Sequence, residues 1–362
     1  MSLAEFENAN AAKAGDRGAL TFFGEVFKAF QMAEKSSGCA SERFYNLAGH
    51  IIRLRFSSSA LVPLITPALE HLAVEEETPA LTVCLWDSAS TGTRMPPPPW
   101  SSDNYVARGE VEGFNDDRIH TTFDLGSGVL NILDAQQNLG IFWIRDARYL
   151  PQWESGAPLR IILHWWMRRH ETQLTHAAAV GNSKGGVLLV GRGGSGKSTS
   201  ALACLDSNLH YVSDDYCLVR ARPVPHVYSI YSSGKLTLGS LEKFPCLETI
   251  FSQVETITAD KMLFFLGKTK YREKISSGFP LRAILLPRVT GGTETALKPV
   301  SQISALRALA PSSIFQLPGA GKSEFETLTR LVKEIPCYSL ELGSNLQRIP
   351  EVISALLGEE AR

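Results

Sequence analysis

The chain has 362 residues, of which 44% are hydrophobic and 20% charged, and its 36 basic and 37 acidic residues give a formal net charge of −1. This composition is ordinary for a globular protein, the length suits two domains or one domain with a large appendage, and the balanced bulk charge predicts no nucleic-acid or membrane-surface partner. The six cysteines form neither a CxxC pair nor a zinc-type cluster, and we find no secretory signal and no apolar run of membrane-spanning length, so we expect reduced, mostly buried thiols in a cytoplasmic protein without a membrane partner.

We expect residues 1–42 to form a lead segment before the first domain. Within it, the stretch ALTFFGEVFKAFQMAE (19–34) has apolar residues at helical spacing. These residues are Phe22, Val26, Phe27, Phe30 and Met32. The pattern predicts a helix that docks either on the core of the protein or on a partner, and it favours the core.

Residues 43–155 are predicted to form an N-terminal α+β domain. Strand-like alternation occurs in HIIRLRFSS (50–58), ALTVCLWD (80–87) and GIFWIRDARYL (140–150). The four prolines at 96–99 predict a loop, because proline disfavours helix and cannot donate to a strand ladder. No catalytic set of residues stands out in this region.

The remaining part, residues 156–362, is predicted to be an α/β catalytic domain. It opens with a mostly buried helix over 157–174, in which Trp165 and Trp166 belong to the core. We expect strands at 185–190, 210–215, 216–221, 226–233, 281–289 and 336–342, and helices at 197–205, 304–310, 324–335 and 349–357.

A phosphate-binding motif lies between the first of these strands and the helix that follows it. The stretch GRGGSGKS fits the pattern GxxxxGK[ST], and strand, loop and helix follow in the required order. Glycines let successive amides point inward at phosphate oxygens, and the helix start adds partial positive charge. Lys197 would reach the β- and γ-phosphates, and the Ser198 hydroxyl would hold Mg²⁺. We expect the nucleotide to be bound by Gly191, Arg192, Gly193, Gly194, Ser195, Gly196, Lys197, Ser198 and Thr199.

A second stretch, LPGAGKSEF, is similar to this motif but does not fit it. The position that requires the first glycine holds Gln316, and Pro318 interrupts the entry. It is predicted to be a surface turn before a helix at 324–334, and the alternative is a mobile loop near the active site.

Three acid–base side chains accompany the motif. Asp214 and Asp215 come at the end of the strand that directly follows the P-loop helix, whereas many P-loop NTPases carry their acidic strand much further along the chain. One carboxylate can lie by Mg²⁺ and the other can accept a proton from an attacking hydroxyl, and the sequence does not say which does which. The alternative is a structural role, because an Asp-Asp pair often only starts a turn. His176 precedes the hairpin partner of the P-loop strand, where its imidazole could lie near the phosphates or serve a structural role.

The stretch THAAAVGNSKGGVLLVGRGGSGKSTSALACLDSNLHYVSDDYCLVR resembles the core of the HPr kinase/phosphorylase family, bacterial serine kinases whose core is akin to that of phosphoenolpyruvate carboxykinase. Its nearest variants are HPr-kinase-like proteins found beside peptide-maturation genes, including lasso-peptide kinases. The resemblance implies a P-loop kinase fold and use of ATP and Mg²⁺, with Lys197 as phosphate clamp and Ser198, Asp214 and Asp215 at the metal. It further implies one of the two aspartates as general base, His176 beside the phosphates, and self-association into homo-oligomers.

The sequence departs from the family in one respect. It lacks the Arg-Gly-Leu-Gly signature that follows the aspartate pair, which argues against HPr as acceptor and against the reverse phosphorylase reaction. Basic residues that could take over its phosphate charge are Lys235, Lys261, Arg282 and Arg288. We therefore expect a kinase that phosphorylates a Ser or Thr hydroxyl of a peptide or protein, with a small hydroxylated molecule as second choice. The alternative is a nucleotide-binding module without turnover that regulates a biosynthetic complex, and a carboxykinase is disfavoured because its metal-binding His and Lys set is missing.

Overall fold

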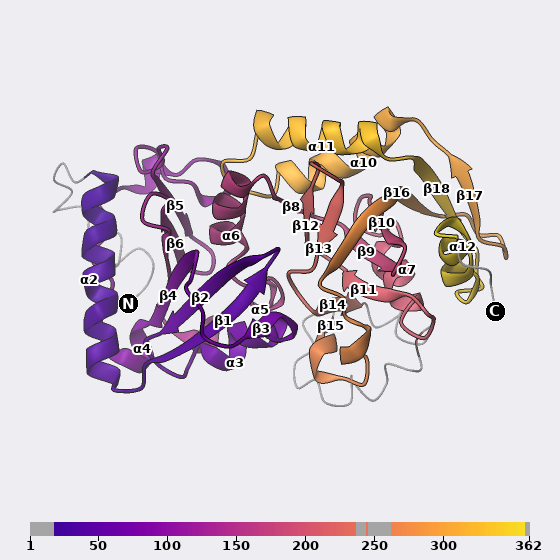
Figure 1. The fold of residues 1–362 in the computed structure, drawn as a ribbon. Helices are drawn as coiled ribbons and strands as arrows, with labels where there is room; N and C mark the ends of the chain where they lie inside the picture. Colours follow the sequence, from indigo (N-terminus) through magenta and orange to yellow (C-terminus); the bar gives the residue numbers. More distant parts are fainter. Residues whose placement is uncertain (1–17, 237–243, 245–261, 359–362) are drawn as a thin grey trace. The chain divides into compact units, whose positions relative to one another are not determined.

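The structure is a computed structural model that describes residues 18–236, 244 and 262–358. It is a mixed α/β protein with two mixed sheets, each in its own compact unit (Figure 1). Unit 1 contains the described residues of 1–66 with 73–166 and 317–319, and unit 2 contains 67–72 with the described residues of 167–316 and 320–362.

Unit 1 is built on a seven-stranded sheet. In spatial order its strands are β3 (Ala73–Val74), β1 (Ser41–Leu47), β2 (His50–Phe56), β4 (Leu81–Asp87), β7 (Leu139–Ile144), β6 (Val129–Asp134) and β5 (Ile119–Asp124). The β2–β4 and β4–β7 pairs are parallel, and the other pairs are antiparallel. The helices are α2 (Ala19–Ser37), α3 (Val62–Ile65), α4 (Ser88–Thr91), α5 (Gln152–Gly156) and α6 (Arg160–Met167).

Helix α2 closes one face of this sheet. Phe22, Val26 and Phe30 are fully buried in a cluster that also contains Trp86 of β4, and Phe22 meets Trp100 edge to face at a centroid distance of 4.9 Å. The expected helix is thus confirmed together with its docking on the core. Met32 is 63% exposed, so its predicted place on the buried side of the helix is wrong.

Unit 2 contains the second sheet. The main order is β11 (His210–Ser213), β9 (Ala178–Asn182), β10 (Gly185–Leu189), β16 (Gly278–Val289), β13 (His226–Tyr228), β12 (Cys217–Arg220) and β8 (Gln173–Thr175), and β18 (Cys337–Leu342) joins β16 and β17 (Ala296–Pro299). A separate ribbon pairs β14 (Ser233–Leu236) with β15 (Met262–Phe265). The helices are α7 (Lys197–Ala203), α10 (Gln302–Ile314), α11 (Lys322–Glu334) and α12 (Arg348–Leu356).

The alternation of side chains along the strands sorts these helices onto two faces. On β10, Val187 and Leu189 pack with α7 and α12, whereas Leu188 belongs to the cluster of α10 and α11. Figure 1 shows the same division, with α10 and α11 on one side of the sheet and α7 and α12 on the other. The result is a three-layer unit in which β10 is buried on both faces, as its unbroken apolar sequence predicts.

Several predicted elements differ in extent from those observed. The helix expected over 157–174 ends as α6 at Met167, because 173–175 instead pair with β12 as strand β8. The strand expected over 226–233 breaks after Tyr228, and its last residue begins β14. The helix expected at 304–310 is the longer α10, which continues through Pro311.

The predicted core residues Trp165 and Trp166 are buried. The cysteines are free thiols that are buried except for exposed Cys39, and Cys246 lies outside the described residues.

Candidate nucleotide-binding site

The loop that carries the predicted phosphate-binding motif runs from the end of β10 to the start of α7. Parallel pairing with β16 anchors β10, and the Val190 amide extends the ladder to the Leu285 carbonyl at 2.9 Å. Gly191 and Gly196 have φ values of 150° and 107°, where a side chain is strained. A Cβ on Gly196 would also collide with Leu342 of β18. These glycines are therefore required by the shape of the loop.

The loop presents unused donors. Within the part of the chain that the structure describes, the amides of Gly193, Gly194 and Gly196 donate no hydrogen bond. A row of free amides in a turn is the usual cradle for phosphate oxygens. Helix α7 has only seven residues, so the partial positive charge at its start is small. The free amides must therefore supply most of the attraction between this loop and a phosphate group.

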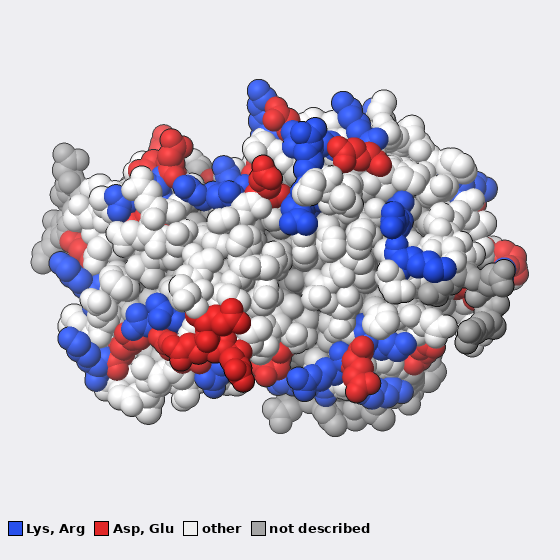
Figure 2. Space-filling model, in the orientation of Figure 1, with Lys and Arg blue, Asp and Glu red and all other residues white. Residues whose placement is uncertain are grey.

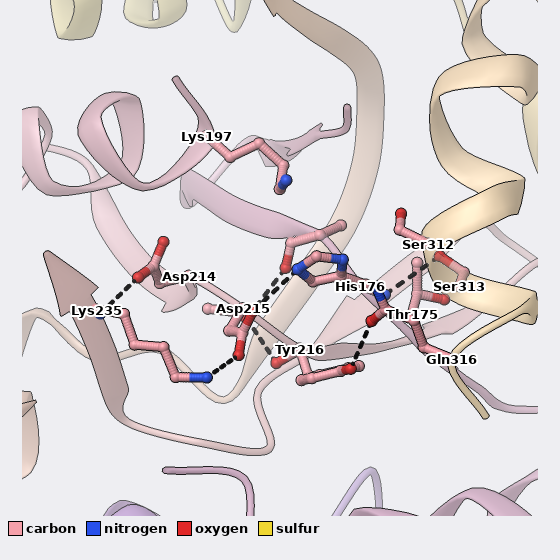
Figure 3. A network of polar contacts seen from close by, with 12 residues as sticks. Thr175, His176, Lys197, Asp214, Asp215, Tyr216, Lys235, Ser312, Ser313 and Gln316 are labelled. Carbon is pink, nitrogen blue, oxygen red and sulfur yellow. Dashed lines mark hydrogen bonds and ion pairs between the residues drawn. The ribbon is translucent and has the colours of Figure 1, made fainter. Parts of the chain in front are cut away.

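Lys197 lies beneath this cradle. It is 7% exposed, and its Nζ donates to the carbonyl oxygen of Gly191 at 2.7 Å and to that of Arg192 at 3.4 Å. Figure 3 shows its side chain extending toward the side on which Asp214, Asp215 and His176 lie. The positive charge is therefore held against the carbonyls of the loop.

The sequence predicts the aspartate pair at the end of a strand, but the structure places the pair in a turn after that strand. Strand β11 ends at Ser213, and the next strand begins at Cys217. The Ser213 hydroxyl closes the turn, since it lies 2.5 Å from the Tyr216 carbonyl oxygen and 3.2 Å from that of Ala177. This second contact fixes the turn beside the residue that follows His176.

Asp214 is the buried member of the pair, with an exposed fraction of 2%. Its Oδ2 accepts the Lys235 amide at 2.9 Å, and its Oδ1 has no hydrogen-bond partner among the described residues. Burial raises the pKa of this carboxyl, against the opposing influence of the nearby Ser198 hydroxyl and the Lys235 amide. A buried carboxylate with a free oxygen is poised to take a proton or a cation.

Asp215 is held by two donors. Its Oδ1 lies 2.9 Å from His176 Nε2, and its Oδ2 lies 2.6 Å from Lys235 Nζ (Figure 3). Burial would raise the pKa of Asp215, but the hydrogen bond from His176 and the charge of Lys235 outweigh it and lower that pKa well below its usual range. The two neighbouring carboxyls are thus pushed to opposite sides of their normal pKa, as in sites that divide roles between two acids.

His176 is oriented on three sides. Its amide donates to Ser313 Oγ of α10 at 3.2 Å, and its ring lies 5.2 Å from that of Tyr216. Because the Asp215 carboxylate only accepts, Nε2 carries the hydrogen, and Nδ1 has no partner among the described residues. The predicted hairpin is also present, since β9 pairs antiparallel with β10.

Among the basic residues considered as substitutes for the missing signature, the structure brings Lys235 to the acidic pair. The buried hydroxyl of Tyr211 on β11 donates to the Ser233 carbonyl at 3.0 Å and so holds β14 against the turn. Arg282 instead donates to the Lys184 carbonyl, and Lys261 lies outside the described residues. The structure gives Arg288 no contact with the pair.

Sequence reasoning missed Tyr216 and Ser313. Tyr216 directly follows the aspartates, a local signal that was available, whereas nothing in the sequence connects Ser313 with His176. The second glycine-rich stretch leads into α11, which begins at Lys322, as expected of a turn before a helix. Gln316, just before that turn, accepts from the Tyr216 hydroxyl at 3.0 Å.

The side chains present fit a magnesium ion held jointly by protein and nucleotide. Among the described residues, no group of three or more His, Cys, Asp or Glu side chains could hold a metal ion without other ligands. The free Oδ1 of Asp214 and the nearby Ser198 hydroxyl provide oxygen ligands of the kind that Mg²⁺ prefers, and phosphate oxygens can complete its shell.

The surface is of mixed charge. On the face drawn in Figure 2, basic and acidic side chains both occur, mostly toward the edges, with one group of acidic side chains at the lower left and an uncharged middle. Of the helices that the structure describes, none has both the length and the apolar character that crossing a membrane requires.

Comparison with known proteins gives matches among solved structures only. No protein-family model matches the chain, and no curated protein matches it in sequence. The solved structure of the Hpr(Ser) kinase/phosphatase from Coxiella burnetii matches with a TM-score of 0.28 and 11% identity, over 51% of this chain and 93% of that one. This is a distant structural resemblance, and function must be argued from the residues of the site.

Proposed function

We propose that this protein is an ATP- and Mg²⁺-dependent kinase of the HPr kinase type that phosphorylates a Ser or Thr hydroxyl of a peptide or protein. One observation carries the proposal. A loop with free amides lies beside two aspartates, and the pKa of Asp214 is raised whereas that of Asp215 is lowered. Phosphoryl transfer requires this pairing of a phosphate cradle with acidic groups that serve the metal and the attacking hydroxyl.

The P-loop would bind the triphosphate. The amides of Gly193, Gly194 and Gly196 face phosphate oxygens, and Lys197 exchanges its loop carbonyls for the β- and γ-phosphates. The stronger charge-assisted bonds to phosphate favour this exchange. Arg192, Ser195 and Thr199 complete the predicted binding segment.

Asp214 and Ser198 would hold the metal. A magnesium ion held by these two side chains would supply positive charge to neutralise the phosphate oxygens. The free Oδ1 of Asp214 supports this assignment, because a bound cation removes the cost of keeping that carboxylate ionised in a buried position.

Asp215 would act on the acceptor. Its lowered pKa keeps it ionised at neutral pH but makes it a weak base, so it would orient the acceptor hydroxyl and take its proton late, once the oxygen that bonds to the γ-phosphorus has become acidic and the bond to the ADP oxygen is breaking. His176 and Lys235 orient the carboxylate, and Lys235 also brings positive charge to the same place. Most of the acceleration would come from positioning and electrostatic stabilisation.

Two variants test the proposal. We expect Lys197→Ala to abolish phosphate transfer from γ-labelled ATP to an array of synthetic Ser- and Thr-containing peptides. We expect Asp215→Asn to retain ATP binding in calorimetry and to lose transfer by about 10²-fold or more. If Asp215→Asn transfers phosphate at the wild-type rate, the assigned mechanism is wrong.

The same assay separates the kinase from the alternative function. A nucleotide-binding module would bind Mg·ATP tightly and label no acceptor on the array. Tight binding without transfer by the wild-type chain would therefore favour a module that regulates a partner complex.

A further inference from the structure

An apolar groove lies on the outer side of α10 and α11, within unit 2. It has a volume of about 640 Å³ and is lined mainly by aliphatic and aromatic side chains. The principal ones are Ile303, Leu306, Ala310, Ile314, Phe315 and Phe325. Ile303 is 65% exposed, Phe315 68% and Phe325 46%, which is unusual for large apolar groups that lie together. The volume is within the range typical of ligand sites.

The same helix borders the groove and the candidate active site. At the end of α10, Ser313 accepts the amide of His176, and the following Ile314 and Phe315 line the groove. Gln316 then returns to the site and bonds to the Tyr216 hydroxyl. Consecutive residues at the end of α10 therefore contact the groove on one side and, on the other, the backbone of His176, whose ring orients Asp215.

The groove also carries charge of one sign. Its charged lining residues are Arg307 and Lys322, and no acidic residue lines it. Arg307 is exposed and has no ion pair with a described residue, and Lys322 is 91% exposed with only a 3.9 Å contact to Glu326. Apolar walls with cationic edges complement an apolar segment that has acidic residues beside it.

We propose that this groove docks the acceptor, through an apolar segment of the acceptor peptide or protein that is flanked by Asp or Glu. This inference rests on the proposed kinase function and names the class of acceptor. Docking outside the site raises the local concentration of the acceptor hydroxyl at Asp215, and it places selection of the acceptor in the groove instead of in the few contacts around the hydroxyl.

The test uses two synthetic peptides and the full-length chain. Both peptides carry Leu at helical spacing and one Ser beyond the apolar segment, with Glu flanks in one and Lys flanks in the other. Binding is followed by fluorescence anisotropy, and transfer by label from ATP. The variants are Ile303→Glu, Phe325→Glu and Arg307→Glu, and Val289→Glu is the control because Val289 is 66% exposed and lies outside the groove.

We expect the Glu-flanked peptide to bind about tenfold tighter than the Lys-flanked one, and Arg307→Glu to reverse this preference. Ile303→Glu and Phe325→Glu should weaken peptide binding and raise the KM for peptide about tenfold, with ATP binding unchanged, whereas Val289→Glu should do neither. If the groove variants change peptide binding as expected but the wild-type chain transfers no phosphate, the groove is a peptide-binding site and the kinase proposal is wrong. Transfer with the same KM in all variants, or a dimer in light scattering that the groove variants dissociate, would overturn the docking proposal.

Discussion

The contact between Lys235 and Asp215 gives a quantitative test of the site. The two side chains are 26% and 21% exposed, and the Nζ–Oδ2 distance is 2.6 Å. A hydrogen bond to a charged group contributes about 1.5–3 kcal/mol when buried, and an exposed ion pair about 0–1 kcal/mol. For this partly exposed pair we expect Lys235→Met to lower the free energy of unfolding by about 1–2 kcal/mol, and the midpoint of thermal unfolding by about 2–8 °C. The Lys235 amide that binds Asp214 remains in the variant.

The assay is a double-mutant cycle of Lys235→Met with Asp215→Asn, measured by denaturant unfolding. The coupling free energy should be about 1–2 kcal/mol at pH 7. Because the pKa of Asp215 is lowered on folding, its stabilisation is present above the unfolded pKa of about 3.9 and is lost as the pH falls toward the folded pKa. The difference between wild type and Lys235→Met should therefore shrink in acid. Additivity of the two substitutions within about 0.3 kcal/mol would refute the described contact.

Two further predictions concern burial. Phe22→Ala should lower the free energy of unfolding by about 3–5 kcal/mol, because Phe22 is fully buried against Trp100. Met32→Ala, on the exposed side of α2, should change the free energy of unfolding by less than about 0.5 kcal/mol. Equal urea midpoints for the two variants would contradict the docking of this helix. Asp214→Asn should leave the protein at least as stable as wild type at pH 7 without Mg²⁺. The pKa of Asp214 is raised on folding, so this carboxyl stabilises the fold below its unfolded pKa, and that contribution is lost as the pH rises through its folded pKa. Unfolding curves between about pH 4 and 8 check this, and a large loss of stability in the variant at neutral pH would contradict the assignment of Asp214 as a strained buried carboxyl.

The elements predicted best from sequence are those set by local patterns. The strand before the glycine-rich loop of residues 191–196, its hairpin partner and the helix after the loop follow from apolar periodicity and from glycines that permit positive φ, and all three are present. Helix α2 was predicted for the same reason. Only its exposed Met32 differs, because spacing alone does not decide how wide the buried stripe of a helix is.

Errors arose where tertiary structure overrides a local signal. The helix predicted over 304–310 stops before Pro311, but α10 continues through this proline to Ile314, and the Phe315 amide donates to the Pro311 carbonyl at 3.1 Å. The apolar pattern predicts Asp214 and Asp215 at the end of a strand, whereas they lie in a turn, and one of the Ser213 contacts that hold this turn is with Ala177, 36 residues away in sequence.

The roles of the site residues depend on contacts that no sequence pattern contains. Asp214 and Asp215 are adjacent and chemically identical. Their pKa values differ because burial raises the pKa of Asp214, whereas the contacts with His176 and Lys235 lower that of Asp215. Lys235 could not be selected from the basic residues of the chain, because pairing of β14 with β15 and the Tyr211 contact bring it to the turn.

The central claim is that the free amides and Lys197 bind a triphosphate together with Mg²⁺. Titration calorimetry of ATP into the full chain, with and without Mg²⁺ and with Lys197→Ala as matched variant, tests it most directly. We predict saturable heat with the wild-type chain that depends on Mg²⁺, and at least about tenfold weaker binding by Lys197→Ala, since the variant loses a charge-assisted bond to phosphate. No heat of association with the wild-type chain, or equal affinity in the variant, would contradict the account.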